Sequence, residues 1–214
     1  MEDLVTDIDS PQLNKLLIHF FNDSVFDTPQ LIQFISRTSI SSALENVHIA
    51  LEDGTAHVSF RPQIDGDVEV SIFCEGLDWQ LSSLEQVCTS CLPFLPTLKG
   101  LYICERTHSQ PHWKDEIEDG VLWLELLHPF TAVKNLYLSE RIALRIGPAL
   151  QELFKGRTAE VLPTLENIFL EGFKSSGRVQ EGIGQFIGAR QSTGHSIAIS
   201  PWPDAEQDMV LVYW

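Results

Sequence analysis

Basic residues are scarce in this sequence. Its 214 residues include 14 Lys and Arg against 30 Asp and Glu, which gives a net charge of −16. Such a charge repels phosphate backbones and anionic lipid headgroups, so nucleic acid and membrane surfaces are excluded as expected partners. A basic segment of a target protein is the partner that this charge favours, although the same charge can also serve only to keep the chain soluble.

Long apolar runs and cysteines are scarce as well. No stretch of 18 apolar residues occurs, and residues 1–10 are acidic, so we expect an intracellular protein, cytoplasmic or nuclear. The few cysteines lie among apolar residues, and we expect them to be reduced core thiols: Cys74, Cys88, Cys91 and Cys104. Cys88 and Cys91 have the spacing of a redox pair or of half a zinc site, but a second ligand pair is missing.

Motifs that carry enzyme chemistry are missing too. The sequence contains no G-x-x-x-x-G-K-[ST], H-E-x-x-H or G-x-S-x-G motif. Gly182, Gly184 and Gly188 do not have dinucleotide-loop spacing, so we interpret them as small residues for close helix packing. His108 and His112 lie in a loop containing proline, and the acidic run at 115–119 lacks calcium-loop spacing. We therefore predict a non-enzymatic protein without metal or cofactor.

What the sequence does contain is an internal repeat of about thirty residues. Residues 44–49, 98–103, 133–138 and 165–170 fit the template apolar-x-x-apolar-x-apolar. The last three positions have period 2, which predicts a short strand in each unit. Weaker members lie at 16–21, 68–74 and 196–200. The predicted strand centres are Ile18, Val47, Ile72, Leu101, Leu136, Ile168 and Ile197.

Segments with helical periodicity lie between most of these strands, at 28–38, 81–95, 119–127, 142–154 and 180–189. Residues 52–75 differ, because two extended stretches flank a turn that contains Asp65 and Gly66. Polar loops are expected at 107–118 and 171–177. Strands joined by crossover helices predict an α/β fold with parallel strands.

Two architectures fit this order of elements. A doubly wound sheet has helices on both faces, whereas a leucine-rich-repeat-like curved parallel sheet has its helices on the convex side. Aromatic residues at the alternate strand positions suit a half-exposed face and favour the second. We predict one domain over residues 1–214, with about six to seven irregular repeats and a C-terminal cap or tail at 203–214.

Several stretches resemble the leucine-rich-repeat-like C-terminal region of fungal F-box proteins, namely residues 78–84, 122–130 with 133–140, and 162–172. The resemblance runs from about residue 16 to residue 202. It implies a substrate receptor of a Skp–cullin–F-box ubiquitin ligase, in which the repeats hold the target protein. Residues 1–31 contain no Leu-Pro-x-Glu opening of an F-box, so adaptor binding is in doubt and target recognition is the implied role.

The repeat also predicts a partner-binding face. Aromatic anchors beside carboxylates suit an Arg- or Lys-containing segment, and the residues concerned are His48, Tyr102, Glu105, Tyr137, Glu140, Phe169 and Glu171. In one alternative, the rings only fill space beneath loops or a C-terminal tail. In another, the chain is a free-standing α/β domain with an unrecognised small-molecule site.

Overall fold

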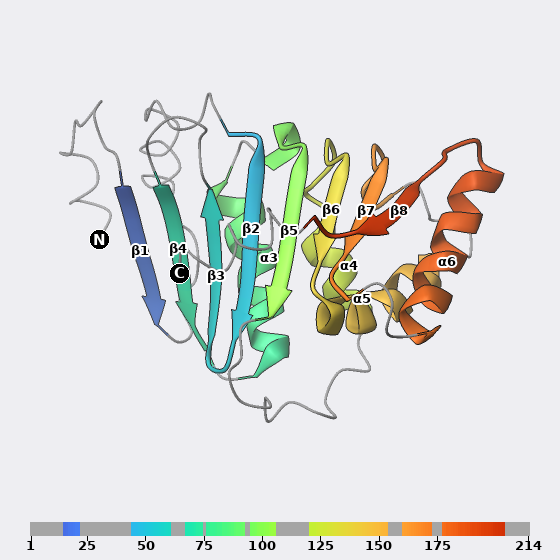
Figure 1. Cartoon of the computed structure of the whole chain (residues 1–214). Coiled ribbons are helices and arrows are strands. Elements are labelled where there is room, and N and C mark those ends of the chain that lie inside the picture. Colours follow the sequence, from blue (N-terminus) through green and yellow to red (C-terminus); the bar gives the residue numbers. More distant parts are fainter. Residues whose placement is uncertain are drawn as a thin grey trace.

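One eight-stranded sheet organises the part of the chain that the computed structural model describes, namely residues 15–21, 44–60, 67–74, 76–92, 95–105, 120–153, 160–172 and 177–203. The strand order is β1-β4-β3-β2-β5-β6-β7-β8 (Figure 1). The strands are β1 (Lys15–Phe21), β2 (Asn46–Glu52), β3 (Thr55–Phe60), β4 (Asp67–Phe73), β5 (Gly100–Glu105), β6 (Asn135–Leu138), β7 (Asn167–Leu170) and β8 (Ala198–Pro201). Strand β3 is antiparallel to both neighbours, and all other neighbouring pairs are parallel. The fold is therefore α/β with a mostly parallel sheet.

The described helices lie on one side of this sheet. They are α3 (Leu77–Cys91), α4 (Gly120–Leu127), α5 (Glu140–Glu152) and α6 (Gly177–Ser192), with a short 3₁₀ turn at Leu95–Thr97. The strands that follow these helices, β5, β6, β7 and β8, are added to the sheet one after another in the same direction. Right-handed crossovers that all advance in one direction across a sheet put their helices on the same face. Figure 1 shows α3, α4 and α5 behind the sheet, and α6 packs against α5. This differs from the alternation of a doubly wound sheet.

The predicted strands are confirmed. The four clear template members coincide with β2, β5, β6 and β7, and the three weaker ones with β1, β4 and β8. Two centres are corrected. Ile199, and not Ile197, pairs with Ile168 of β7. In the same way Val70, and not Ile72, pairs with Ile18 of β1. Positions 197 and 199 have the same parity, so a period of 2 cannot distinguish between them.

Two chain reversals precede the parallel part of the sheet. Strands β3 and β4 are antiparallel, as the turn signal at Asp65 and Gly66 predicted, although that turn lies outside the described residues. The hairpin between β2 and β3 was not predicted. It turns at Asp53 and Gly54, and Gly54 has φ 76°, a conformation that glycine adopts without steric cost.

The same pair of backbone hydrogen bonds recurs at the start of successive repeats. The carbonyl oxygen of Glu45 accepts from the N–H groups of Lys99 and Gly100, at 2.8 and 3.0 Å. The Lys99 carbonyl accepts in the same way from residues 134 and 135, and the carbonyl of residue 134 from residues 166 and 167. Each repeat is thus fixed to the one before it by equivalent contacts, as in proteins built from stacked repeats.

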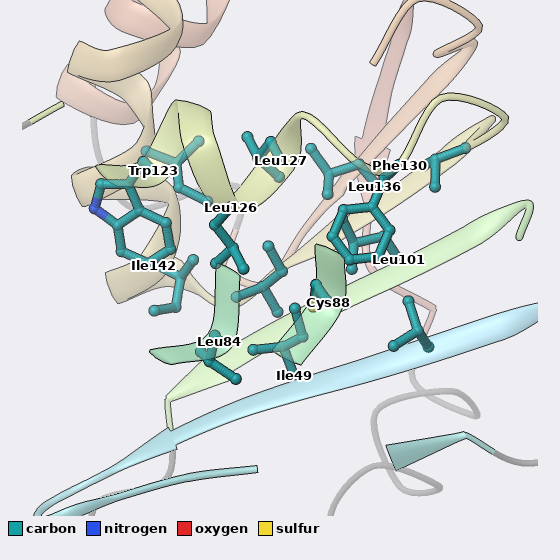
Figure 2. Close-up of a cluster of buried hydrophobic side chains, with 14 of the residues drawn as sticks. Ile49, Leu84, Cys88, Leu101, Trp123, Leu126, Leu127, Phe130, Leu136 and Ile142 are labelled. Carbon is teal, nitrogen blue, oxygen red and sulfur yellow. The ribbon is translucent and has the colours of Figure 1, made fainter. Parts of the chain in front are cut away.

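The main core lies between the sheet and the helix layer (Figure 2). Strand residues meet residues of α3, α4 and α5 there, and the labelled members are Ile49, Leu84, Cys88, Leu101, Trp123, Leu126, Leu127, Phe130, Leu136 and Ile142. Burying one such side chain contributes roughly 1.5–3 kcal/mol. Cys74, Cys88 and Cys104 are thiols that form no disulfide, as expected, while the side chain of Cys91 lies outside the described residues.

Helix boundaries agree with the sequence to within a few residues for α4, α5 and α6. Helix α3 begins at Leu77 instead of residue 81 and ends at Cys91 instead of residue 95. Asp78 in its first turn interacts favourably with the helix dipole, and the proline at position 93 disfavours helical backbone before it. The helix predicted at 28–38 and the loop predicted at 107–118 lie outside the described residues. Among those that are described, no helix is both long and apolar enough to cross a membrane.

Candidate functional site

Four aromatic side chains stack in a row on the sheet face opposite the helices, which we call the front face. His48, Tyr102, Tyr137 and Phe169 occupy paired positions on β2, β5, β6 and β7. Successive ring centroids lie 4.3, 4.0 and 4.5 Å apart, with interplanar angles of 14°, 4° and 13°. Side chains at equivalent positions of neighbouring parallel strands are separated by the strand spacing of about 4.8 Å, which allows stacking. We call these four residues the ring ladder. All four belong to the predicted partner-binding face, and the strand pairing brings them side by side.

A fifth aromatic residue covers the middle of the ring ladder. The indole of Trp202 lies 5.9 Å from the Tyr102 ring and 5.7 Å from the Tyr137 ring, tilted by 50° and 53°. Tyr102 and Tyr137 are each 7% exposed, and Trp202 is 4% exposed. The two end members, His48 and Phe169, are only partly buried. Trp202 therefore covers the middle of the ladder, whereas the predicted cap or tail lies outside the described residues from position 204 onward.

The three predicted carboxylates do not form one group beside the ladder. Glu105 belongs to the helix side because it follows Tyr102 by an odd number of strand positions. Its side chain is 1% exposed, and Arg141 Nη1 donates to its Oε1 at 3.1 Å. Its backbone N–H donates to Ser139 Oγ at 3.3 Å. Glu105 thus fixes the start of α5 to the sheet and is not presented on the front face.

Arg145 adds to the electrostatics at this end of α5. Burial lowers the pKa of Arg145, while attraction to Glu105 raises it and repulsion from Arg141 lowers it. Glu140 is the first residue of α5 and is half-buried, where its carboxylate interacts favourably with the helix dipole. Glu171 directly follows β7 and is exposed, two residues beyond Phe169. Of the three predicted carboxylates, Glu171 is the one that adjoins an exposed end of the ladder.

A polar cluster on the front face was missed by the sequence analysis. His57 of β3 lies between two carboxylates, with Nδ1 3.6 Å from Glu69 Oε1 and Nε2 3.8 Å from Glu52 Oε2. The same Nδ1 lies 3.0 Å from Ser71 Oγ, and that hydroxyl donates to Glu69 at 3.4 Å. The pairing of Glu69 with Ser59, and of Ser59 with His48, puts this cluster at the β2 end of the ring ladder. Alternating polar residues along β3 were the signal that could have revealed it.

The polar cluster has the residue types of a serine hydrolase site, because the imidazole of His57 lies between the Ser71 hydroxyl and the Glu52 carboxylate. However, Ser71 is 1% exposed and its hydroxyl already donates to Glu69. A nucleophile must reach its substrate, so this geometry gives no support to acyl transfer. Among the described residues, no group of three or more His, Cys, Asp or Glu side chains is placed to hold a metal ion.

Comparisons with family models, with curated proteins and with solved structures find no match to this chain. The resemblance to fungal F-box proteins therefore stays a prediction from the sequence. The ring ladder and the carboxylates near its two ends are the features of this chain that bear on its function.

Proposed function

We propose that this chain is a protein-recognition module whose front face binds a basic segment of a partner protein. The observation that carries the proposal is the ring ladder, which stacks across four neighbouring strands on the side of the sheet opposite the described helices. Stacked aromatic residues on a sheet surface offer a large, rigid contact area, and such residues are enriched among the side chains that dominate binding energy.

The architecture that we propose is a leucine-rich-repeat-like arc. Its support is the sequence order of β5, β6, β7 and β8 in the sheet, the helices on one side, and the equivalent hydrogen bonds at each repeat. In such an arc the concave side is the sheet face away from the helices, and it is the usual binding surface of stacked-repeat proteins. The front face corresponds to that side.

Charge decides the kind of partner that we propose. Glu171 lies at the Phe169 end of the ring ladder, and Glu52 and Glu69 lie near its His48 end. An Arg or Lys side chain that stacks on an end ring and pairs with a neighbouring carboxylate gains both a cation–π contact and an ion pair. The net charge of −16 steers a basic segment toward this chain and an acidic one away from it.

The resemblance to fungal F-box proteins extends this proposal to ubiquitin ligation. In that setting the chain is the target-recognition region of a substrate receptor, and the bound segment belongs to the protein that is marked for degradation. Recruitment of the ligase adaptor is not part of the proposal, because the sequence lacks the F-box opening in residues 1–31.

A photo-crosslinking experiment tests the recognition proposal. A benzoylphenylalanine residue at position 169 samples the front face, and the same residue at position 144 samples the helix layer, where Leu144 is 41% exposed. We expect a protein that crosslinks from position 169 and not from position 144. Equal yields from both positions, or no crosslink from position 169 in lysates, would count against the proposal.

Affinity measurements with the captured protein then test the chemistry of the contact. Phe169→Ala and Glu171→Lys should each weaken binding at least about fivefold, since loss of an anchor side chain costs more than 1 kcal/mol. Leu144→Ala and Glu125→Lys remove an exposed apolar side chain and reverse an exposed negative charge on the helix layer, and they should leave the affinity unchanged. Binding should also weaken as salt is raised. Equal effects of the front-face and helix-layer substitutions would refute the proposed site.

A further inference from the structure

The segment that follows β8 turns back across the front face. Ser200 of β8 pairs with Phe169 of β7, yet Trp202 reaches the rings of Tyr137 and Tyr102, which lie two and three strands away from β8, respectively. Figure 1 shows this part of the chain running from the end of β8 toward β5. The chain thus lays an extended segment over the surface that we propose for the partner.

In the described part of this segment, residues 201–203, one side chain is buried. Trp202 is buried, whereas Pro201 and Pro203 on either side of it are exposed. The Trp202 N–H donates to the Leu170 carbonyl at 2.9 Å. Neither proline has an N–H group, so the flanking residues cannot donate to the neighbouring strand. A single buried aromatic anchor between exposed residues is also how a short peptide ligand commonly binds its receptor.

We propose that Trp202 is an intramolecular occupant of the partner site, and that the partner is an extended segment whose own aromatic side chain takes the place of Trp202 on Tyr102 and Tyr137. This inference rests on the proposed function and deepens it. A segment without an aromatic anchor would leave the two tyrosine rings uncovered when Trp202 departs. Basic residues beside the anchor would meet Glu171 and the carboxylates near His48.

The arrangement makes binding self-limiting. A tethered occupant has a high effective concentration at its site, so a free segment must compete with it. The apparent affinity for a partner is the intrinsic affinity multiplied by the fraction of molecules in which the site is vacant. Removing the indole without disturbing the sheet should therefore strengthen the binding of an external segment.

The test uses the full chain and a labelled peptide with the sequence of residues 198–203, measured by fluorescence anisotropy. Trp202→Ala should bind this peptide at least tenfold more tightly than wild type, and should not bind a control peptide in which alanine replaces the tryptophan. Trp79→Ala is the matched protein control, because Trp79 is 64% exposed on α3. The proposal is overturned if Trp202→Ala, with an unchanged circular dichroism spectrum, binds the peptide no better than wild type.

Hydrogen exchange of the wild-type protein provides a second measurement that does not depend on the folding of the variant. The N–H of Trp202 donates to Leu170, and the N–H of Glu171 donates to Leu138 in the equivalent position one repeat earlier. If the segment leaves its site while the sheet stays intact, the Trp202 amide should exchange with solvent at least tenfold faster than the Glu171 amide. Equal rates would identify the segment as a fixed cap and would overturn the proposal.

The two proposals can fail separately. If the captured partner loses affinity for Phe169→Ala and binds wild type and Trp202→Ala equally, the front face is a binding site but Trp202 does not compete for it. If neither Phe169→Ala nor Trp202→Ala changes the affinity, the recognition proposal fails, and the inference about Trp202 fails with it.

Discussion

Helices α5 and α6 approach each other at Gly147 and Gly182, and we predict that these two glycines differ in what they tolerate. A Cβ atom on Gly182 would lie 2.9 Å from the Gly147 carbonyl carbon, 3.0 Å from its oxygen and 3.2 Å from its Cα. All three are backbone atoms, which cannot rotate away as a side chain can. Gly182→Ala therefore forces the two helices apart.

The magnitude follows from two opposing contributions. Overpacking costs about 1–3 kcal/mol, while replacing an interior helical glycine by alanine gains about 1 kcal/mol of helix propensity. Gly184 lies on the same helix, and a Cβ there would meet nothing within 4 Å. Gly184→Ala thus keeps the gain without the cost. The difference between the two variants equals the packing cost alone, about 2 kcal/mol.

Urea denaturation followed by circular dichroism, together with calorimetry, measures this difference. We expect Gly184→Ala to be more stable than wild type and Gly182→Ala to melt about 4–8 °C below Gly184→Ala. Gly147→Ala should be nearly neutral, because its Cβ would meet Gly182 Cα at an ordinary 3.9 Å and the following proline offsets the gain in propensity. Equal stability of the Gly182 and Gly184 variants would refute the close helix contact.

Two further predictions concern Arg190 and Cys74. Arg190 is buried, and its Nη2 donates to the carbonyls of Leu162 and Pro163 at 2.9 and 2.7 Å. Arg190→Met should therefore lower the free energy of unfolding, measured in urea, by about 2–3 kcal/mol. A loss below about 0.5 kcal/mol would contradict this role. Burial raises the pKa of the Cys74 thiol and a hydrogen bond with Ser83 lowers it. Ser83→Ala should therefore raise this pKa further and slow the alkylation of Cys74 by iodoacetamide at about pH 9. Peptide mass spectrometry measures the rate, and an unchanged rate would be evidence against the hydrogen bond.

Much of the fold could be predicted because it depends on local patterns. The template apolar-x-x-apolar-x-apolar identified β2, β5, β6 and β7, and period 2 identified which strand residues share a face. Gly182, Gly184 and Gly188 were expected to allow close helix packing, and the structure bears this out for Gly182 but not for Gly184 or Gly188. Spacing cannot distinguish them, since only the position of α5 decides which glycine faces a neighbour.

The site was predictable in part for the same reason. His48, Tyr102, Tyr137 and Phe169 follow from the repeat, because equivalent residues of parallel neighbouring strands must lie side by side. Glu105 was grouped with them, although its odd offset from Tyr102 along the strand already put it on the helix side. His57 and its carboxylate neighbours were missed because they come together only through the antiparallel pairing of β2, β3 and β4.

The sequence by itself determined the repeat, the succession of strands and helices, and which residues form the ladder. Each of these depends on local patterns, in which the relevant residues lie within about one repeat length of each other. The tertiary structure decided what covers the ladder. Trp202 lies 65 residues after Tyr137 and 100 after Tyr102, and no periodicity in the sequence connects them. Only the stacking of β7 and β8 onto the sheet brings the chain to where it can turn back. The burial of the indole against two rings then favours that path over exposure to water.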